Sequence, residues 1–153
     1  MNIHVCLVSD QTLANIIPAL MEKPALVVLV CSREMANRKL DKRLCKLLDA
    51  EGIQVQIHGD APDTDLKQIT DFAYALIGKI EADHPQAEVT LNVTGGTKLM
   101  AMGFADSFRG FAVRAIYTDT AHRRIETLPE DPKQAAPAVA MTNVLTVHQY
   151  LQA

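Results

Sequence analysis

Residues 88–102 read Glu-Val-Thr-Leu-Asn-Val-Thr-Gly-Gly-Thr-Lys-Leu-Met-Ala-Met, and they set the architecture of the whole chain. Residues 89–93 alternate between β-branched and apolar types, which predicts a buried strand. Two glycines then end the strand, and an apolar helix follows them. The pattern is therefore a strand, a tight polar turn and a helix N-terminus.

Such a turn suits an anion, most often a phosphate. Its free backbone N–H groups point outward together, and glycines let a ligand approach them closely. Thr94 and Thr97 add hydroxyls, and Lys98 adds a positive charge that the helix dipole disfavours unless an anion is bound. The alternative is a simple capping turn with a solvated lysine. The stretch matches neither the P-loop nor the dinucleotide-binding glycine pattern, so it supports neither of those functions.

Composition indicates an ordinary soluble globular domain. The chain has 153 residues, of which 48% are hydrophobic and 22% charged, with a net charge of −3. A mildly acidic chain argues against binding to long nucleic acids. Cys6, Cys31 and Cys45 lack Cys-x-x-Cys spacing and are expected to be reduced thiols of a cytoplasmic protein. No signal peptide is evident, the longest apolar run is too short to span a bilayer, and we expect no membrane partner, cofactor or metal.

The rest of the chain alternates strands with helices. Further strands are expected at residues 2–8, 25–31, 53–58, 112–117 and 123–128, with the last two forming a hairpin. A helix is expected after the polar turn at 9–12 and through about residue 22, where Pro18 suggests a kink or an early end, and further helices are expected at 34–50 and 62–83. Residues 1–130 thus form the predicted ligand-binding domain. Residues 131–153 are interpreted as a linker and the start of a following segment.

This order predicts an α/β, Rossmann-like fold of three layers, with a mostly parallel sheet of about six strands and a C-terminal β-hairpin. If the strand order is 3-2-1-4-5, the first and fourth strands are neighbours, and ligands bind at their carboxyl ends. The polar turns after those two strands then meet at one site. The predicted ligand-binding residues are Ser9, Asp10, Gln11, Thr12, Thr94, Gly95, Gly96, Thr97 and Lys98.

The helix at 99–108 is apolar nearly all round, whereas a helix on the surface of a monomer should show a polar face. We expect it to form a homodimer interface through Met100, Met102, Phe104 and Phe108, with deeper burial inside the monomer as the alternative. By contrast, the basic residues that begin at Arg38 in the 34–50 helix are interpreted as a solvated face.

These residues resemble a known family. Residues 92–101, Asn-Val-Thr-Gly-Gly-Thr-Lys-Leu-Met-Ala, together with residues 8–12, Val-Ser-Asp-Gln-Thr, are similar to the CRISPR-associated Rossmann-fold (CARF) sensor domain. The resemblance covers residues 1 to about 130 and is closest to type III CRISPR ancillary nucleases. It implies a homodimer that binds a cyclic oligoadenylate, in particular cyclic tetra-adenylate, and signals to an attached or partner effector domain in antiviral defence.

Two alternatives stay open beside the sensor. One is a ring nuclease that cleaves the same ligand without metal, for which the resemblance implies Ser9 and Lys98 as catalytic residues. No histidine falls in either turn, because His4 lies in a strand and His58 and His122 lie at other loop edges, so cleavage is expected to be absent or slow. The other alternative is a generic mononucleotide-binding or assembly domain.

Overall fold

The computed structural model describes residues 1–129 and 132–141. Its strands are β1 (Asn2–Leu7), β2 (Leu26–Val30), β3 (Gln54–His58), β4 (Glu88–Asn92), β5 (Arg114–Asp119), β6 (Arg124–Leu128) and β7 (Val139–Ala140). Its helices are α1 (Thr12–Glu22), α2 (Arg33–Asn37), α3 (Leu40–Ala50), α4 (Leu66–Asp83) and α5 (Lys98–Ser107), and a short 3₁₀ helix, η1, spans Pro132–Gln134.

The strands form one sheet in the order β3-β2-β1-β4-β5-β6-β7. Each pair from β3 to β5 is parallel, and β6 and β7 add antiparallel strands at one edge. The predicted order 3-2-1-4-5 and the β5–β6 hairpin are confirmed. Strand β7 lies in the segment interpreted as a linker, and it pairs with Arg124 and Ile125. The rest of the predicted following segment, residues 142–153, lies outside the described residues.

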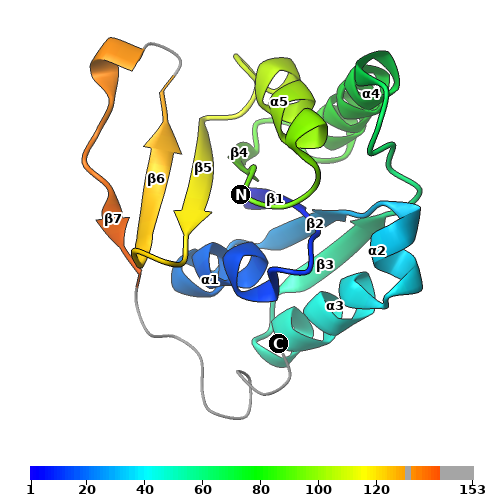
Figure 1. Ribbon diagram of the computed structural model, residues 1–153, viewed down its shortest axis with the longest axis horizontal. Helices are drawn as coiled ribbons and strands as arrows, with labels where there is room; N and C mark the ends of the chain where they lie inside the picture. Colours follow the sequence, from blue (N-terminus) through cyan, green and yellow to red (C-terminus); the bar gives the residue numbers. More distant parts are fainter. Residues whose placement is uncertain (130–131, 142–153) are drawn as a thin grey trace.

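The sheet is covered on both faces, which gives the predicted three layers (Figure 1). Alternate residues of β1 point to opposite sides, as the pleat requires. Ile3, Val5 and Leu7 pack in one cluster with α4 and α5, whereas Cys6 packs in a second cluster with α1 and α3. Strand β1 therefore contributes to both hydrophobic clusters.

The prediction of one continuous helix at 34–50 is wrong, because the segment forms two helices, α2 and α3. Lys39 adopts a left-handed conformation with φ of 60°, which breaks the helical path between α2 and α3. Ser32 begins α2 by accepting a hydrogen bond from the Met35 N–H. The break lets Leu40 and Leu44 turn into the core while α2 stays on the surface. Helix α1, in contrast, continues through Pro18 to Glu22.

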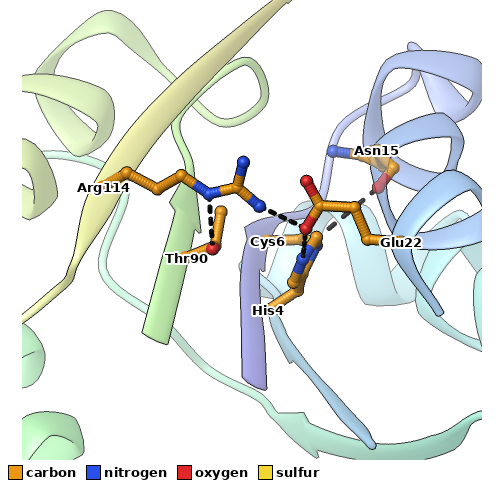
Figure 2. A network of polar contacts seen from close by, with 6 residues as sticks. All are labelled: His4, Cys6, Asn15, Glu22, Thr90 and Arg114. Atoms are coloured by element: carbon orange, nitrogen blue, oxygen red, sulfur yellow. Dashed lines mark hydrogen bonds and ion pairs between the residues drawn. The ribbon is translucent and has the colours of Figure 1, made fainter. Parts of the chain in front are cut away.

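A partly buried polar network ties the end of α1 to the sheet (Figure 2). His4 is 1% exposed, and its Nε2 lies 2.8 Å from Oε2 of Glu22. Arg114 of β5 also binds Glu22, and its Nε donates to Oγ1 of Thr90 at 3.0 Å. Burial lowers the pKa of His4 despite the neighbouring carboxylate. The network therefore fixes α1 relative to β1, β4 and β5.

Candidate functional site

The turns that follow β1 and β4 are in direct contact. A Cβ atom on Gly95 would lie 1.9 Å from the carbonyl oxygen of Leu7, so only glycine allows the β4–α5 turn to approach the end of β1 this closely. Gly96 has a φ of +75°, a conformation that glycine adopts without strain. The polar segments 9–12 and 94–98 therefore meet at the carboxyl edge of the sheet.

Two buried asparagines hold these turns in shape. Asn15 of α1 donates to the Leu7 carbonyl at 2.7 Å and accepts from the Ser9 N–H at 3.1 Å. Asn92 donates to the Ala14 carbonyl at 3.0 Å, so it connects the end of β4 to α1. Sequence reasoning missed Asn15, although a lone asparagine within an apolar helical pattern could have drawn attention to it.

The two predicted threonine hydroxyls already have partners. Thr94 Oγ1 donates to Asn92 Oδ1 at 2.5 Å and accepts from the Thr118 N–H at 2.7 Å. Thr97 Oγ1 donates to the Asp63 carbonyl at 2.8 Å and caps α5 by accepting from the Met100 N–H at 3.1 Å. A hydroxyl has one hydrogen to donate, and in this structure each of the two donates it within the protein. Both hydroxyls therefore shape the turn, and their binding to a phosphate stays a prediction.

Other donors remain available at the same edge. Lys98 is exposed at the first position of α5, and the first backbone N–H groups of a helix have no acceptor within the helix. Ser9 Oγ accepts from the Gln11 N–H at 3.2 Å, which leaves its own hydrogen free to donate. Thr12, in contrast, is 5% exposed and lies below the surface of the site. The arrangement can therefore bind an anion through Ser9, Lys98 and backbone amides.

Arg38, interpreted from sequence as part of a solvated face, lies beside the first turn. Its Nη1 is 3.8 Å from Oδ2 of Asp10, and both side chains are about half exposed. The break between α2 and α3 directs this end of α2 toward the turn, which no local sequence pattern could reveal. Arg38 offsets the negative charge of Asp10 next to a site that would bind an anion.

A third turn begins at the same edge, because β5 is parallel to β4. Within it, His122 Nδ1 lies 2.9 Å from Asp119 Oδ2. The pKa of Asp119 is lowered, first by the backbone N–H of His122, which donates to the carboxylate. His122 is 69% exposed, so its second ring nitrogen faces solvent. The sequence analysis placed His122 at an unrelated loop edge, whereas the strand pairing brings its turn next to Thr94.

The interface predicted for α5 needs correction. Met100, Phe104 and Phe108 are 1%, 0% and 1% exposed, because α4 and the sheet of the same chain cover them. The rings of Phe104 and Phe108 stack with centroids 5.7 Å apart. These side chains are covered without a second subunit. The alternative, deeper burial inside the monomer, therefore holds for these three residues. Met102 is the exception, at 67% exposed.

A Rossmann-like sheet with polar turns after its first and fourth strands is the arrangement that the resemblance to CARF domains predicts. The family model described as the Card1 CARF domain matches residues 3–150, and the chain belongs to that family. No curated protein matches the chain in sequence. Among the described residues, no helix is long and apolar enough to cross a membrane.

Solved structures with the same fold include proteins bound to cyclic oligonucleotides. Can2 from Sulfobacillus thermosulfidooxidans, in complex with cyclic tetra-adenylate, is 28% identical with a TM-score of 0.79, covering 99% of this chain and 40% of that one. Protein VC1899 from Vibrio cholerae has a TM-score of 0.83 at 15% sequence identity. The match covers 99% of this chain and 38% of the VC1899 chain. Enterococcus italicus Csm6, bound to cyclic hexa-2'-fluoro-hexa-dAMP, has a TM-score of 0.68 at 19% sequence identity. The match covers 78% of this chain and 33% of the Csm6 chain. This chain thus spans about 40% of the Can2 chain.

The close approach at Gly95 predicts a sharp difference between two glycines. Gly95→Ala should destabilise the domain by about 1–3 kcal/mol or more, because the added methyl group meets the Leu7 carbonyl. Gly78→Ala should stabilise it by about 0.5–1 kcal/mol, because Gly78 lies within α4 and a Cβ there has free space. Urea unfolding measures both free energies. A neutral effect at Gly95 would contradict the assigned contact.

Proposed function

We propose that this domain is a sensor that binds a cyclic oligoadenylate, in particular cyclic tetra-adenylate, across a homodimer. The observation that carries the proposal is the contact between the two polar turns, which gathers phosphate-binding donors at one edge of a CARF fold. The structure of Can2 with cyclic tetra-adenylate supports this choice of ligand. The third open function, a generic mononucleotide-binding or assembly domain, has no comparable support.

The charge of the chain does not oppose an anionic ligand. Backbone N–H groups and a serine hydroxyl contact phosphates without adding net charge, and Lys98 supplies one cation in the first turn of α5. Helix α5 has no acidic residue in that turn, so nothing there repels a phosphate. A net charge of −3 is therefore compatible with a small anion held locally.

A symmetric dimer suits this ligand. Cyclic tetra-adenylate has two-fold symmetry, so two copies of the chain can present the same turns to each half of the ring. Met102 lies one helical turn after Lys98, on the same face of α5. Leu66 on the adjacent α4 is also exposed, at 51%. We assign the dimer contact to Met102 and Leu66, and the signal to an attached or partner effector domain.

The first prediction of this proposal concerns Lys98. A hydrogen bond to a charged group contributes about 1.5–3 kcal/mol, so Lys98→Ala should weaken binding of cyclic tetra-adenylate by roughly one to two orders of magnitude. Isothermal titration calorimetry against cyclic tri-, tetra- and hexa-adenylate and linear tetra-adenylate measures the loss and the ring size together.

Lys46→Ala is the matched control, because Lys46 is an exposed lysine on α3. It should leave the affinity unchanged. Arg38→Ala, which removes the partner of Asp10, should cause a smaller loss than Lys98→Ala. Equal losses at Lys98 and Lys46 would show that only the overall charge matters.

The dimer proposal makes a second prediction. Met102→Glu should split the dimer and abolish ligand binding while the monomer stays folded, because Met102 is exposed in the single chain. Phe104→Glu should instead unfold the domain, because it places a charge in the core. Ile57→Glu, on the distant edge strand β3, is the control for an exposed apolar residue. Light scattering and circular dichroism distinguish these outcomes, and a monomeric unmodified protein with ligand bound would overturn the dimer.

Metal-free cleavage of the ring is a second candidate, favoured by the Asp119–His122 pair near the site. In that reaction the ribose 2'-oxygen bonds to phosphorus and the bond from phosphorus to the 5'-oxygen breaks, which leaves a 2',3'-cyclic phosphate. His122 would accept the 2'-hydroxyl proton, and the leaving 5'-oxygen would take up a proton from water to become a hydroxyl. We expect cleavage to be absent or slow. Excess protein is incubated with labelled cyclic tetra-adenylate and a chelator. Linear products within minutes, lost in Ser9→Ala, Lys98→Ala or His122→Ala, would make the domain an enzyme.

A further inference from the structure

A basic groove lies along α3, at the surface of the molecule (Figure 1). It holds about 340 Å³ and is lined by four cationic side chains and by Leu47, which is buried and lies at its base. The four cationic residues are Lys39, Lys42, Arg43 and Lys46, and all four are exposed. No carboxylate lines the groove among the residues that the structure describes. Its rim is therefore positively charged throughout.

The chain concentrates its positive charge in this segment. Residues 38–46 hold five of the 15 Lys and Arg residues, but only one of the 18 Asp and Glu residues, Asp41. Five positive charges and one negative charge give the segment a net charge of +4, which leaves −7 for the rest of a chain whose total is −3. Such segregation places a local positive potential on an otherwise acidic protein.

The lysines of the groove lack the ion pairs that arginines make elsewhere on the surface. Arg33 lies 3.3 Å from a carboxylate oxygen and Arg124 lies 4.0 Å from another. Within the described part of the chain, no carboxylate forms an ion pair with Lys39, Lys42 or Lys46. Three ammonium groups of the groove are therefore available to an external anion.

This arrangement is unfavourable for α3 itself. Lys39 and Arg43 are four residues apart, as are Lys42 and Lys46, so like charges are neighbours on one side of the helix and repel each other. The cations also gather toward the N-terminal half of α3, where the helix dipole disfavours them, and the last turn has no basic residue. An anionic partner would offset this repulsion.

The groove fits a short acidic segment of a protein better than a nucleic acid. Residues 33–58 contain no Phe, Tyr or Trp, so bases would find no aromatic ring to stack on. Lys39 and Lys46 are about 10 Å apart along α3, given its rise of 1.5 Å per residue, which is the length of about three extended residues. A longer polyanion would extend over the rest of the chain, which is acidic and repels it.

We propose that this groove docks an acidic segment of another protein, in which about three or four Asp or Glu residues lie close together. The carboxylates would accept hydrogen bonds from the ammonium groups of Lys39, Lys42 and Lys46. The methylene groups of the partner would pack on the aliphatic stems of the lysines. This inference does not depend on the phosphate site, whose cation Lys98 lies on α5.

Three labelled probes of six units test the class of partner. Fluorescein-labelled hexaglutamate, hexaglutamine and hexauridylate are titrated with the full chain at neutral pH and low salt, and fluorescence anisotropy measures binding. Saturable binding of hexaglutamate, none of hexaglutamine and weaker binding of the RNA are expected, and added salt should weaken the hexaglutamate complex. No binding of hexaglutamate, or tighter binding of hexauridylate, would overturn the proposal.

A matched pair of double variants tests the place of binding. Lys42→Gln with Lys46→Gln should weaken hexaglutamate binding by about three- to tenfold, the value of two exposed ion pairs. Lys67→Gln with Lys79→Gln is the control, because it removes two exposed lysines of α4 and changes the net charge equally. The control should bind like the unmodified chain. Equal losses in the two double variants would show that only the net charge matters, and would contradict the assigned groove.

Two further measurements separate this groove from the other proposed contacts. Cyclic tetra-adenylate should not displace bound hexaglutamate, and displacement would place the peptide in the phosphate site and overturn the proposal. Light scattering at low salt should show no assembly larger than a dimer. A larger assembly that is lost in the variant with Lys42→Gln and Lys46→Gln would assign the groove to carboxylates of a second copy of this chain, and would overturn the proposal of a different protein.

Discussion

The site depends on one close contact, the approach of the β4–α5 turn to the last carbonyl of β1. That approach is possible only because residue 95 has no side chain, since a Cβ would lie 1.9 Å from the Leu7 oxygen. The contact brings Lys98 and the amide groups of α5 near Ser9. Asn15 and Asn92 then hold the two turns by bonding to backbone groups of both. The site is therefore built by packing between the turns that follow two adjacent parallel strands, β1 and β4.

The polar residues of the motif divide into two groups with different roles. Thr94, Thr97 and Asn92 use their side chains within the protein, where they cap α5 and join β4 to β5 and α1. Ser9 and Lys98 keep donors that face outward. Preorganisation by the first group reduces the cost of ordering the second group when a ligand binds.

Helix α5 carries charges at both ends that oppose its dipole. Lys98 stands at the positive N-terminus, and Asp106 stands near the negative C-terminus. Each arrangement is unfavourable for an isolated helix, and a bound anion would offset the first of them. An anion at the N-terminus is the basis of the proposed function.

The sequence alone determined the α/β class, the strand order and the two turns that meet, because these follow from hydrophobic periodicity, glycine positions and the rules of parallel sheets. It could not determine which apolar face of α5 is covered, since α4 comes from a distant part of the chain and packs over Phe104. Nor could it assign the hydroxyl of Thr97, whose acceptor is the backbone of Asp63. The positions of Arg38 and His122 likewise depend on the break at Lys39 and on the pairing of β5 with β4. Local patterns specify the elements, whereas hydrogen-bond partners and burial depend on neighbours that only the tertiary structure brings together.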